Sequence, residues 1–242
     1  MDKIYCYEGT DVLKNKLDIR DEETLDLIEA EQSRAAMMLM YNKGFDDFSP
    51  SGFYHIHYDL FKDIYDWAGK PRVINIIKRE SILCGQSVWY SNDENIEADL
   101  QKAFEALNSI EWKSLSREQF IKALVPKIAE VWKVHPFREG NTRTTVMLLT
   151  MFIEHHSYFV DKELLAASAG YVRNSLVLAS FDENSEYEHL EKILLDAVTD
   201  KPIEYSDYSI SDETNSKYKK YQSENYEPQK HEVMPKDYKH QK

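Results

Sequence analysis

The chain has 242 residues, and its 43 Asp and Glu outnumber its 30 Lys and Arg, which gives a formal net charge of −13 at pH 7. Such an acidic chain is unsuited to direct binding of nucleic acid, because that requires a basic surface to displace counterions, and a protein partner fits better. The length suits one domain followed by a tail.

The sequence indicates a protein that is neither membrane-bound nor disulfide-stabilised. It has no apolar run of about 18 residues, and its start lacks the basic and then apolar pattern of a signal peptide, so we expect a cytoplasmic protein without a membrane helix. The two cysteines, Cys6 and Cys84, show no CxxC pairing and indicate neither a zinc site nor a disulfide framework. Delivery into a host cell by a specialised secretion system would not be visible in these features of the sequence.

Apolar residues recur at helical spacing along most of the chain, and capping residues mark the helix ends. The predicted helices span residues 22–40, 53–67, 92–107, 116–134, 142–156, 162–179 and 185–198. We therefore expect a mainly α fold, with a helical domain over residues 1–198 whose core covers about 53–198.

The composition changes abruptly beyond Thr199. Residues 199–242 are rich in Lys, Glu, Asp, Ser, Tyr and Gln and contain few aliphatic side chains. Such a segment buries too little apolar surface to offset the entropy of ordering it, so a disordered tail is predicted. The alternatives are an arm that faces the substrate, or a site of self-modification on one of the tail's tyrosines.

The loop His135–Arg143 carries a base, an acid, a glycine and an arginine within nine residues, between two predicted core helices. Gly140 allows close approach of a ligand to the backbone, and the N–H groups that open the next helix can bind an anion. Arg143 suits phosphate oxygens, Glu139 suits Mg²⁺, and His135 can accept a proton near neutral pH. Together they describe attack of a hydroxyl on a Mg-bound nucleotide. Taken singly, the same residues are typical of a helix cap, a turn and a solvated cation.

The loop resembles the motif of the Fic family, HPFx[D/E]GN[G/K]RxxR, which reads HPFREGNTRTTV in this chain. A second similarity lies upstream, at Ile56-His57, Leu60-Phe61, Tyr65 and Trp67-Ala68-Gly69, which look like the family's IHxxLFxxxYxWAG segment. Weaker similarity extends the resemblance over most of the first 198 residues.

The resemblance implies a helical fold that transfers AMP from ATP to a Ser, Thr or Tyr hydroxyl of a target protein. His135 would be the general base, Phe137 would anchor the loop in the core, and Glu139 would hold Mg²⁺. The anion hole would consist of Gly140, Asn141 and Thr142, and Arg143 would bind a phosphate of the leaving pyrophosphate.

The family also implies a β-hairpin flap, which would be Val73–Trp89 in this chain. An extended segment of the target would pair with this flap by strand addition. Lys78 matches a lysine often seen there, and we expect it to contact the nucleotide.

Two positions depart from the motif. Thr142 replaces the second glycine; it keeps a backbone N–H, but its side chain restricts φ and crowds the phosphates. Val146 replaces the final arginine, which in the family helps to hold the γ-phosphate and pairs with an inhibitory glutamate. The strength of ATP binding and the mode of inhibition therefore stay open.

The family's inhibitory motif reads [S/T]xxxE[G/N], and several pairs in this chain have its spacing without the final Gly or Asn. Ser209 with Glu213 is the most plausible pair, and we nevertheless expect that no such glutamate inhibits the enzyme in cis. A small antitoxin carrying the motif is a possible partner and would favour a toxin–antitoxin role.

Two alternatives to AMP transfer remain. Doc-like toxins resemble Fic proteins but carry a lysine in place of the second glycine and transfer the γ-phosphoryl group; Thr142 argues against that activity. A degenerate Fic fold that binds nucleotide or a partner without turnover is the other alternative, and Val146 keeps it open.

Three other features are given simpler explanations. Glu154-His155-His156 looks metal-binding, but consecutive residues of a helix point about 100° apart and cannot converge. We interpret it as a solvated helix end. Packing explains His57 at least as well as a catalytic role does. Arg138, at the variable position of the motif, is expected to face solvent, and contact with the nucleotide or the target is the alternative.

Overall fold

The computed structural model describes residues 2–182, 184–203, 219–221 and 231–234. Its α-helices are α1 (Glu22–Lys43), α2 (Pro50–Phe61), α3 (Ile96–Asn108), α4 (Arg117–Val134), α5 (Asn141–His155), α6 (Lys162–Ala167), α7 (Ala169–Ala179) and α8 (Glu188–Ala197). Short 3-10 turns are η1 (Ser81–Leu83), η2 (Asp93–Asn95) and η3 (Trp112–Ser114), and the strands are β1 (Asn75–Ile77), β2 (Phe159–Val160), β3 (Val198–Thr199) and β4 (Glu232–Met234). No helix in this part of the chain is long and apolar enough to cross a membrane.

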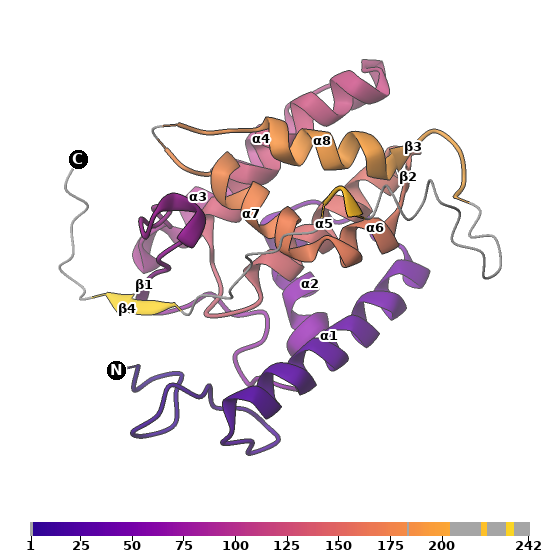
Figure 1. Ribbon diagram of the computed structural model, residues 1–242. Helices are drawn as coiled ribbons and strands as arrows, with labels where there is room; N and C mark the ends of the chain where they lie inside the picture. The colour runs from indigo at the N-terminus through magenta and orange to yellow at the C-terminus, as the bar shows by residue number, and fades with distance from the viewer. Residues whose placement is uncertain (1, 183, 204–218, 222–230, 235–242) are drawn as a thin grey trace.

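Helices α4 and α5 form the centre of the molecule, with α3, α7 and α8 against α4 and with α2 against α5 (Figure 1). Helix α4 begins with a capping box, in which Ser116 and Gln119 each bond the other's backbone N–H. Its apolar residues at helical spacing, Phe120, Leu124 and Ile128 among them, are fully buried. The predicted central helix pair is therefore confirmed.

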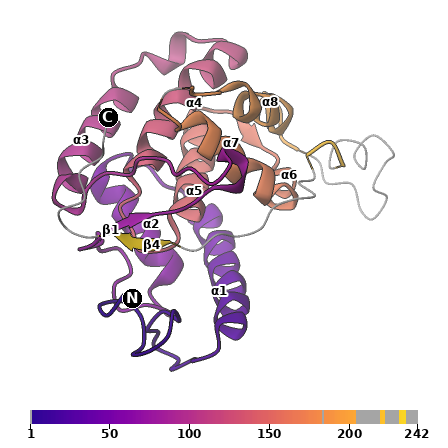
Figure 2. The same ribbon diagram turned by 60° about the vertical axis from the view of Figure 1, so that its left-hand side comes forward.

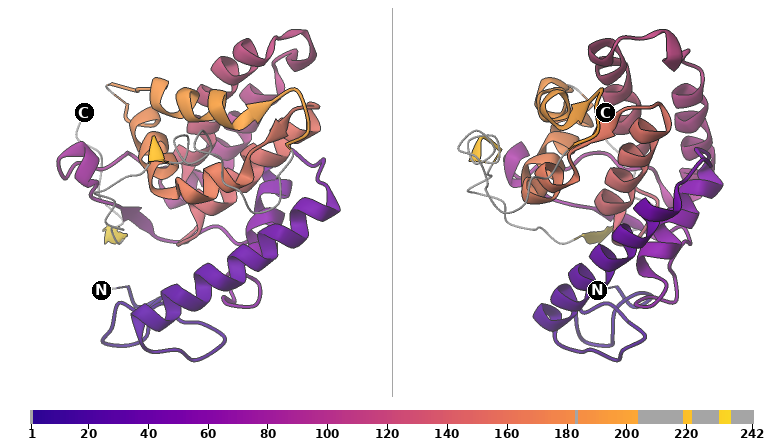
Figure 3. Two further views of the ribbon diagram at one scale, coloured as in Figure 1. Left: turned by 45° about the vertical axis from the view of Figure 1, so that its right-hand side comes forward. Right: turned by 90° about the vertical axis from the view of Figure 1, so that its right-hand side faces the viewer.

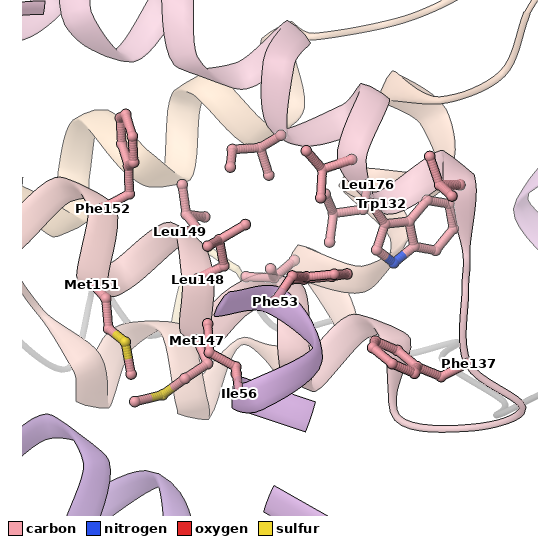
Figure 4. Packing of buried hydrophobic residues seen from close by; sticks show 14 of the residues in the cluster. Phe53, Ile56, Trp132, Phe137, Met147, Leu148, Leu149, Met151, Phe152 and Leu176 are labelled. Atoms are coloured by element: carbon pink, nitrogen blue, oxygen red, sulfur yellow. The ribbon is translucent and has the colours of Figure 1, made fainter. Parts of the chain in front are cut away.

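The loop between α4 and α5 is attached to this core by one side chain. Phe137 is fully buried, and its ring lies 5.6 Å from that of Phe53 on α2. Figure 4 shows both rings beside the apolar face of α5, where Met147 and Leu148 are buried. Packing therefore fixes the loop at the centre of the fold.

Helix α1 lies along the outside of the bundle and packs against α2 (Figure 3). Asp21 caps its N-terminus by accepting a hydrogen bond from the backbone N–H of Thr24 at 2.9 Å. Two polar residues of this helix, Glu29 and Ser33, are buried. These two side chains reach the start of α5, as described below.

Most predicted helices are present, with two corrections. The helix predicted over 162–179 is divided at the buried Ser168, whose φ of −110° and ψ of 24° separate α6 from α7, although the alanines around it favour a continuous helix. The helix predicted over 53–67 ends as α2 at Phe61, and successive turns then carry the chain to Gly69, whose φ is +73°.

The flap predicted at Val73–Trp89 does not form a regular hairpin. Within the described chain the only β-bridge between its two halves joins Glu80 and Gln86, and β1 pairs instead with β4 from the C-terminal segment (Figure 2). Glu80 is buried and forms two hydrogen bonds of 2.5 and 2.6 Å with Arg173 of α7. This pair holds the flap turn against α7.

The structure also places three short parts of the segment for which the composition predicts disorder: residues 199–203, of which Thr199 belongs to β3, and the parts around Tyr221 and His231. Tyr221 is buried between α7 and α8, where its ring lies edge-on to Tyr171 and its hydroxyl is 2.6 Å from Asp196. His231–Met234 lies along β1. Neither contact is visible in the composition, because each depends on a few specific residues.

Candidate active site

His135 occupies the end of α4 in the left-handed backbone conformation, with φ 50° and ψ 56°. Such a conformation is rare for a residue with a Cβ and costs about 1–2 kcal/mol. The following Pro136 cannot continue the helix. The imidazole stacks on Tyr90 with ring centroids 3.8 Å apart, and its Nδ1 lies 3.3 Å from the carbonyl oxygen of Trp132. A proton on Nδ1 would face that carbonyl and leave Nε2 free to accept another proton.

Burial lowers the pKa of His135 well below its usual value, and the nearby His231, Arg72 and Lys78 lower it further. The imidazole is therefore neutral at pH 7. A neutral imidazole is the form that a general base requires.

Arg72 holds the backbone that carries His135. Its Nε donates to the carbonyl oxygen of His135 at 3.0 Å, Nη1 donates to Ile74 at 2.7 Å, and Nη2 donates to Ser91. Its own backbone N–H donates to Pro136 at 2.7 Å. Burial lowers the pKa of the guanidinium to about 10. Sequence reasoning missed Arg72, because its partners are carbonyl groups that no motif records.

The turn after His135 is shaped by Asn141. The side-chain amide of Asn141 accepts from the N–H of Phe137 at 2.9 Å and donates to its carbonyl at 2.8 Å. The loop itself thus fixes the side chain of Asn141, while its backbone N–H lies at the start of α5.

His57 supports the same loop from α2. Its ring stacks on Phe137 at 3.7 Å, Nδ1 accepts from the N–H of Gly69 at 2.9 Å, and Nε2 lies 3.0 Å from the carbonyl oxygen of Glu139. Burial lowers its pKa to about 3, so the ring is neutral. Of the two interpretations of His57, these contacts favour a packed histidine that supports the loop.

Gly140 is required by the space at this position. Its φ is +83°, and a Cβ built on it would lie 2.4 Å and 2.5 Å from two ring carbons of Phe61. Helix α5 begins directly after it, and the first N–H groups of a helix have no partner within the helix. The loop therefore presents the start of α5 as a place for an anion.

Glu139 is kept ionised at the mouth of the loop. Burial alone would raise its pKa, but a hydrogen bond from His231 and the charge of Lys78 outweigh that effect and hold the pKa well below its usual value. Glu139 Oε1 also accepts from the N–H of Gly140 at 3.0 Å. Lys78, next to β1, is buried, and burial lowers its pKa. The structure thus brings Lys78 toward the predicted metal ligand.

The first residues of α5 are held from two sides. Arg143 forms an ion pair with Glu29 of α1, and its Nη1 donates to Ser33 Oγ at 2.9 Å. Thr142 Oγ accepts from the indole N–H of Trp132 at 3.1 Å. The two side chains are thus partly committed to protein contacts. Sequence reasoning did not identify Glu29 or Ser33.

Arg138 is not solvent-exposed, which corrects the prediction made from its variable position. Its Nε donates to Asp2 at 2.7 Å, and both side chains are buried. The pair ties the N-terminal segment to the loop.

The C-terminal segment reaches this site through His231. Its Nε2 lies 3.0 Å from Nε2 of His135, and its Nδ1 lies 3.2 Å from Oε2 of Glu139. Burial lowers the pKa of His231 to about 4. Nothing in the sequence indicated that this histidine meets the loop.

The residues fit a magnesium site only in part. In the described chain no three His, Cys, Asp or Glu side chains gather as a metal site. Glu139 is an ionised carboxylate at the start of α5, and Mg²⁺ usually takes one or two carboxylates and completes its shell with phosphate oxygens and water. The protein would therefore supply one ligand.

The other motifs lie away from the loop. Glu154 pairs with Lys162 at 2.6 Å and His156 bonds the carbonyl of Phe152, so these residues do form a helix end. The pair Ser209 and Glu213 falls outside the described residues.

Known proteins share this architecture. Residues 47–153 match the Fic/DOC family. The chain is 34% identical over 168 residues to a Sinorhizobium fredii protein named probable protein adenylyltransferase y4lH, a match that covers 66% of this chain and 80% of the relative. The chain belongs to the Fic/DOC family.

Further similar proteins show how far the similarity extends. Protein adenylyltransferase VbhT of Bartonella schoenbuchensis is 27% identical over 161 residues; the match covers 65% of this chain and 32% of VbhT, so this chain spans about a third of the length of that relative. The crystal structure of BepC from Bartonella tribocorum, described with bound AMPPNP, has a TM-score of 0.69 at 21% identity and covers 82% of this chain and 97% of that one. The N-terminal Fic domain of a Bartonella quintana protein has the same TM-score of 0.69 at 22% identity and covers 82% of this chain and 93% of that one, which establishes the Fic fold.

Proposed function

We propose that this chain is a protein adenylyltransferase, which transfers AMP from ATP to a Ser, Thr or Tyr hydroxyl of another protein. The observation that carries the proposal is the convergence of His135 Nε2 and the Glu139 carboxylate on one point, which the ring of His231 now occupies. The edge of β1 lies beside this point and already pairs with an extended segment. The names of the relatives point to the same activity.

In this proposal His135 is the general base. The target hydroxyl oxygen attacks the α-phosphorus of ATP and its proton passes to Nε2 of His135, while the bond from that phosphorus to the β-phosphate breaks and pyrophosphate leaves. Arg72 holds the His135 backbone, and Tyr90 fixes the plane of the ring. Such positioning favours the reaction because the base is already oriented before the hydroxyl attacks.

The start of α5 would bind the phosphates. The N–H groups of Gly140, Asn141 and Thr142 form the anion hole, and Arg143 and Lys78 add positive charge. Glu139 would hold Mg²⁺, which when bound would neutralise phosphate charge. His231 contacts Glu139 in this structure, so the carboxylate becomes available to a metal only when His231 moves away.

The two departures from the motif affect affinity. Val146 lies one turn into α5, packs against the core and offers no charge to a phosphate. Thr142 is bonded to Trp132, which turns its side chain toward the protein and leaves its backbone N–H in place. We therefore expect transfer with weaker ATP binding than an arginine at position 146 would give.

The partner is a protein target that pairs with the edge of the flap, and we place the reaction in the cytoplasm, where ATP is available. An antitoxin of the usual Fic type inhibits through a glutamate that pairs with the final arginine of the motif, and this chain has Val146 at that position. Regulation by such a partner therefore requires other contacts.

The test uses ATP labelled on either the α- or the γ-phosphate, in a cell lysate with Mg²⁺. We expect protein labelling from α-labelled ATP alone, and no labelling by the His135→Ala variant. The nucleotide affinity of this variant should be nearly unchanged, because His135 contacts the hydroxyl rather than the phosphates. Labelling from γ-labelled ATP alone would mean a Doc-like kinase. The absence of any His135-dependent label would leave a binding role only.

A further inference from the structure

The segment His231–Met234 lies against the candidate active site as a bound peptide would. Strand β4 pairs antiparallel with β1, with Asn75 opposite Met234 and Ile77 opposite Glu232. Continuing this register by one residue brings His231 beside Lys78, at the end of β1. An extended segment that adds a strand to an exposed edge is a common mode of peptide recognition.

His231 fills the space between the two groups that the proposed reaction needs. Its two ring nitrogens lie 3.0 Å from His135 Nε2 and 3.2 Å from Glu139 Oε2, and its side chain is only 2% exposed. A hydroxyl that gave its proton to His135 would have to stand at the same point. Imidazole has no hydroxyl, so His231 can occupy the position without becoming the product.

The next residue of the segment interacts with the flap through charge. Glu232 Oε1 lies 3.2 Å from Nε of Arg79, and both side chains are more than half exposed. Exposed ion pairs of this kind add little affinity. They do favour one strand register, and they favour an acidic over a basic residue opposite Arg79.

A second attachment keeps the segment close to the site. Tyr221 is buried against Tyr171, and both Lys220 and the Tyr221 hydroxyl lie 2.6 Å from Asp196 on α8. Nine residues, 222–230, separate this anchor from His231. A short tether gives an effective concentration of the order of millimolar, so even a weak peptide can remain in place.

We propose that His231–Met234 is a pseudosubstrate held in cis, with His231 in the place of the residue to be modified and Glu232 as the residue that follows it. This inference rests on the proposed adenylyltransferase activity and adds its regulation and a feature of its targets. A target must displace the segment before its hydroxyl can reach His135. Targets with an acidic residue directly after the modified hydroxyl residue gain the contact with Arg79.

Removing the imidazole tests the inhibition. His231→Ala in the full chain should raise labelling of target proteins from α-labelled ATP by about tenfold or more, since a competitor at millimolar effective concentration is weakened. The matched control is His55→Ala, which removes an exposed histidine of α2 that pairs with Asp59. It should leave labelling unchanged. Equal labelling by the wild type and His231→Ala would overturn the inference while the enzyme assignment stands.

Replacing the imidazole with a hydroxyl tests the position. His231→Ser and His231→Tyr place a short and a long hydroxyl at the same point, and at least one should acquire one AMP at position 231 in the presence of Mg²⁺ and ATP. Peptide mass spectrometry would locate the modification, and His135→Ala in the same chain should abolish it. Modification of neither variant, with target labelling intact, would overturn the pseudosubstrate position.

Amide hydrogen exchange separates the two proposals because it needs no activity. The amides of Asn75–Ile77 should exchange faster in His231→Ala than in the wild type, in the absence of nucleotide. Faster exchange without labelling in any variant would overturn the enzyme assignment and support occupancy of the flap edge. Unchanged exchange would overturn the occupancy itself.

Discussion

Replacement of Gly140 by alanine should damage the loop by two separable effects. The φ of +83° is unfavourable for a residue with a Cβ, by about 1–2 kcal/mol. The new Cβ would also meet two ring carbons of Phe61 at 2.4 Å and 2.5 Å, and overpacking of this kind typically costs about 1–3 kcal/mol. We therefore expect Gly140→Ala to lower the free energy of unfolding by about 2–5 kcal/mol, measured by urea denaturation monitored by circular dichroism.

Gly85→Ala is the matched control for the backbone effect. Gly85 has a φ of +86°, but a Cβ added there would have no atom within 4 Å, so only the conformational cost applies. The difference between the two variants then measures the close contact with Phe61, about 1–3 kcal/mol. The double variant Gly140→Ala with Phe61→Leu should recover part of that difference. If Gly140→Ala cost no more than Gly85→Ala, the argument from close packing would be refuted.

Three further changes probe the supports of the loop. Arg72→Lys should lower the free energy of unfolding by about 2–4 kcal/mol in urea denaturation, because a lysine cannot reach the carbonyls of His135, Ile74 and Ser91 together; a loss below 1 kcal/mol would contradict this. The pKa of His57 is about 3 in the folded chain and 6.5 in the unfolded chain, so the contribution of the neutral imidazole to stability is complete above pH 6.5 and is lost as the pH falls toward 3. At pH 5 the free energy of unfolding should have fallen by about 2 kcal/mol. This loss should be absent from the pH profile of His57→Gln. Thr142→Gly should remove the hydrogen bond from Trp132 and reduce stability by about 1–2 kcal/mol while leaving the anion-binding N–H in place, so calorimetry should show ATP affinity that is unchanged or improved.

The parts of the fold that follow from local sequence were predictable. The helices around the loop were found from apolar spacing, and Ser116 marked the start of α4 because a cap acts within three residues. The break at Ser168 and the early end of α2 at Phe61 were missed, because tertiary packing decides them and helical spacing continues past both.

The candidate site was predictable as a set of residues but not as a set of partners. The loop motif identified His135, Glu139 and Gly140 directly. The contact between Arg72 and His135 spans 63 residues, and the contact between Arg143 and Glu29 spans 114. Such pairs carry no local pattern, so one sequence cannot reveal them.

Arg138 shows the opposite error. Its position in the loop is variable in the motif, and variability suggested exposure. In the structure it is buried by Asp2, which lies 136 residues away in the chain. A position can therefore vary among the sequences that share the motif and still be buried in this chain, here by contact with the N-terminal segment.

The tail is the clearest case of composition being a weak guide. Its polarity predicts disorder, and a stretch this polar forms no core of its own. Tyr221 and His231 nevertheless find partners, because the folded domain supplies the buried surface and the unpaired strand edge. The C-terminal segment is therefore held by surfaces that the folded domain provides.

The central claim is that one site, built on His135, transfers AMP and is occupied in cis by His231. The most direct test measures the initial rate of protein labelling from α-labelled ATP for the wild type, His231→Ala, His135→Ala and the double variant. We predict a rate about tenfold or more above the wild type for His231→Ala and no labelling in either chain that lacks His135. Labelling that persisted in the double variant would contradict the account, because it would place the chemistry at another site.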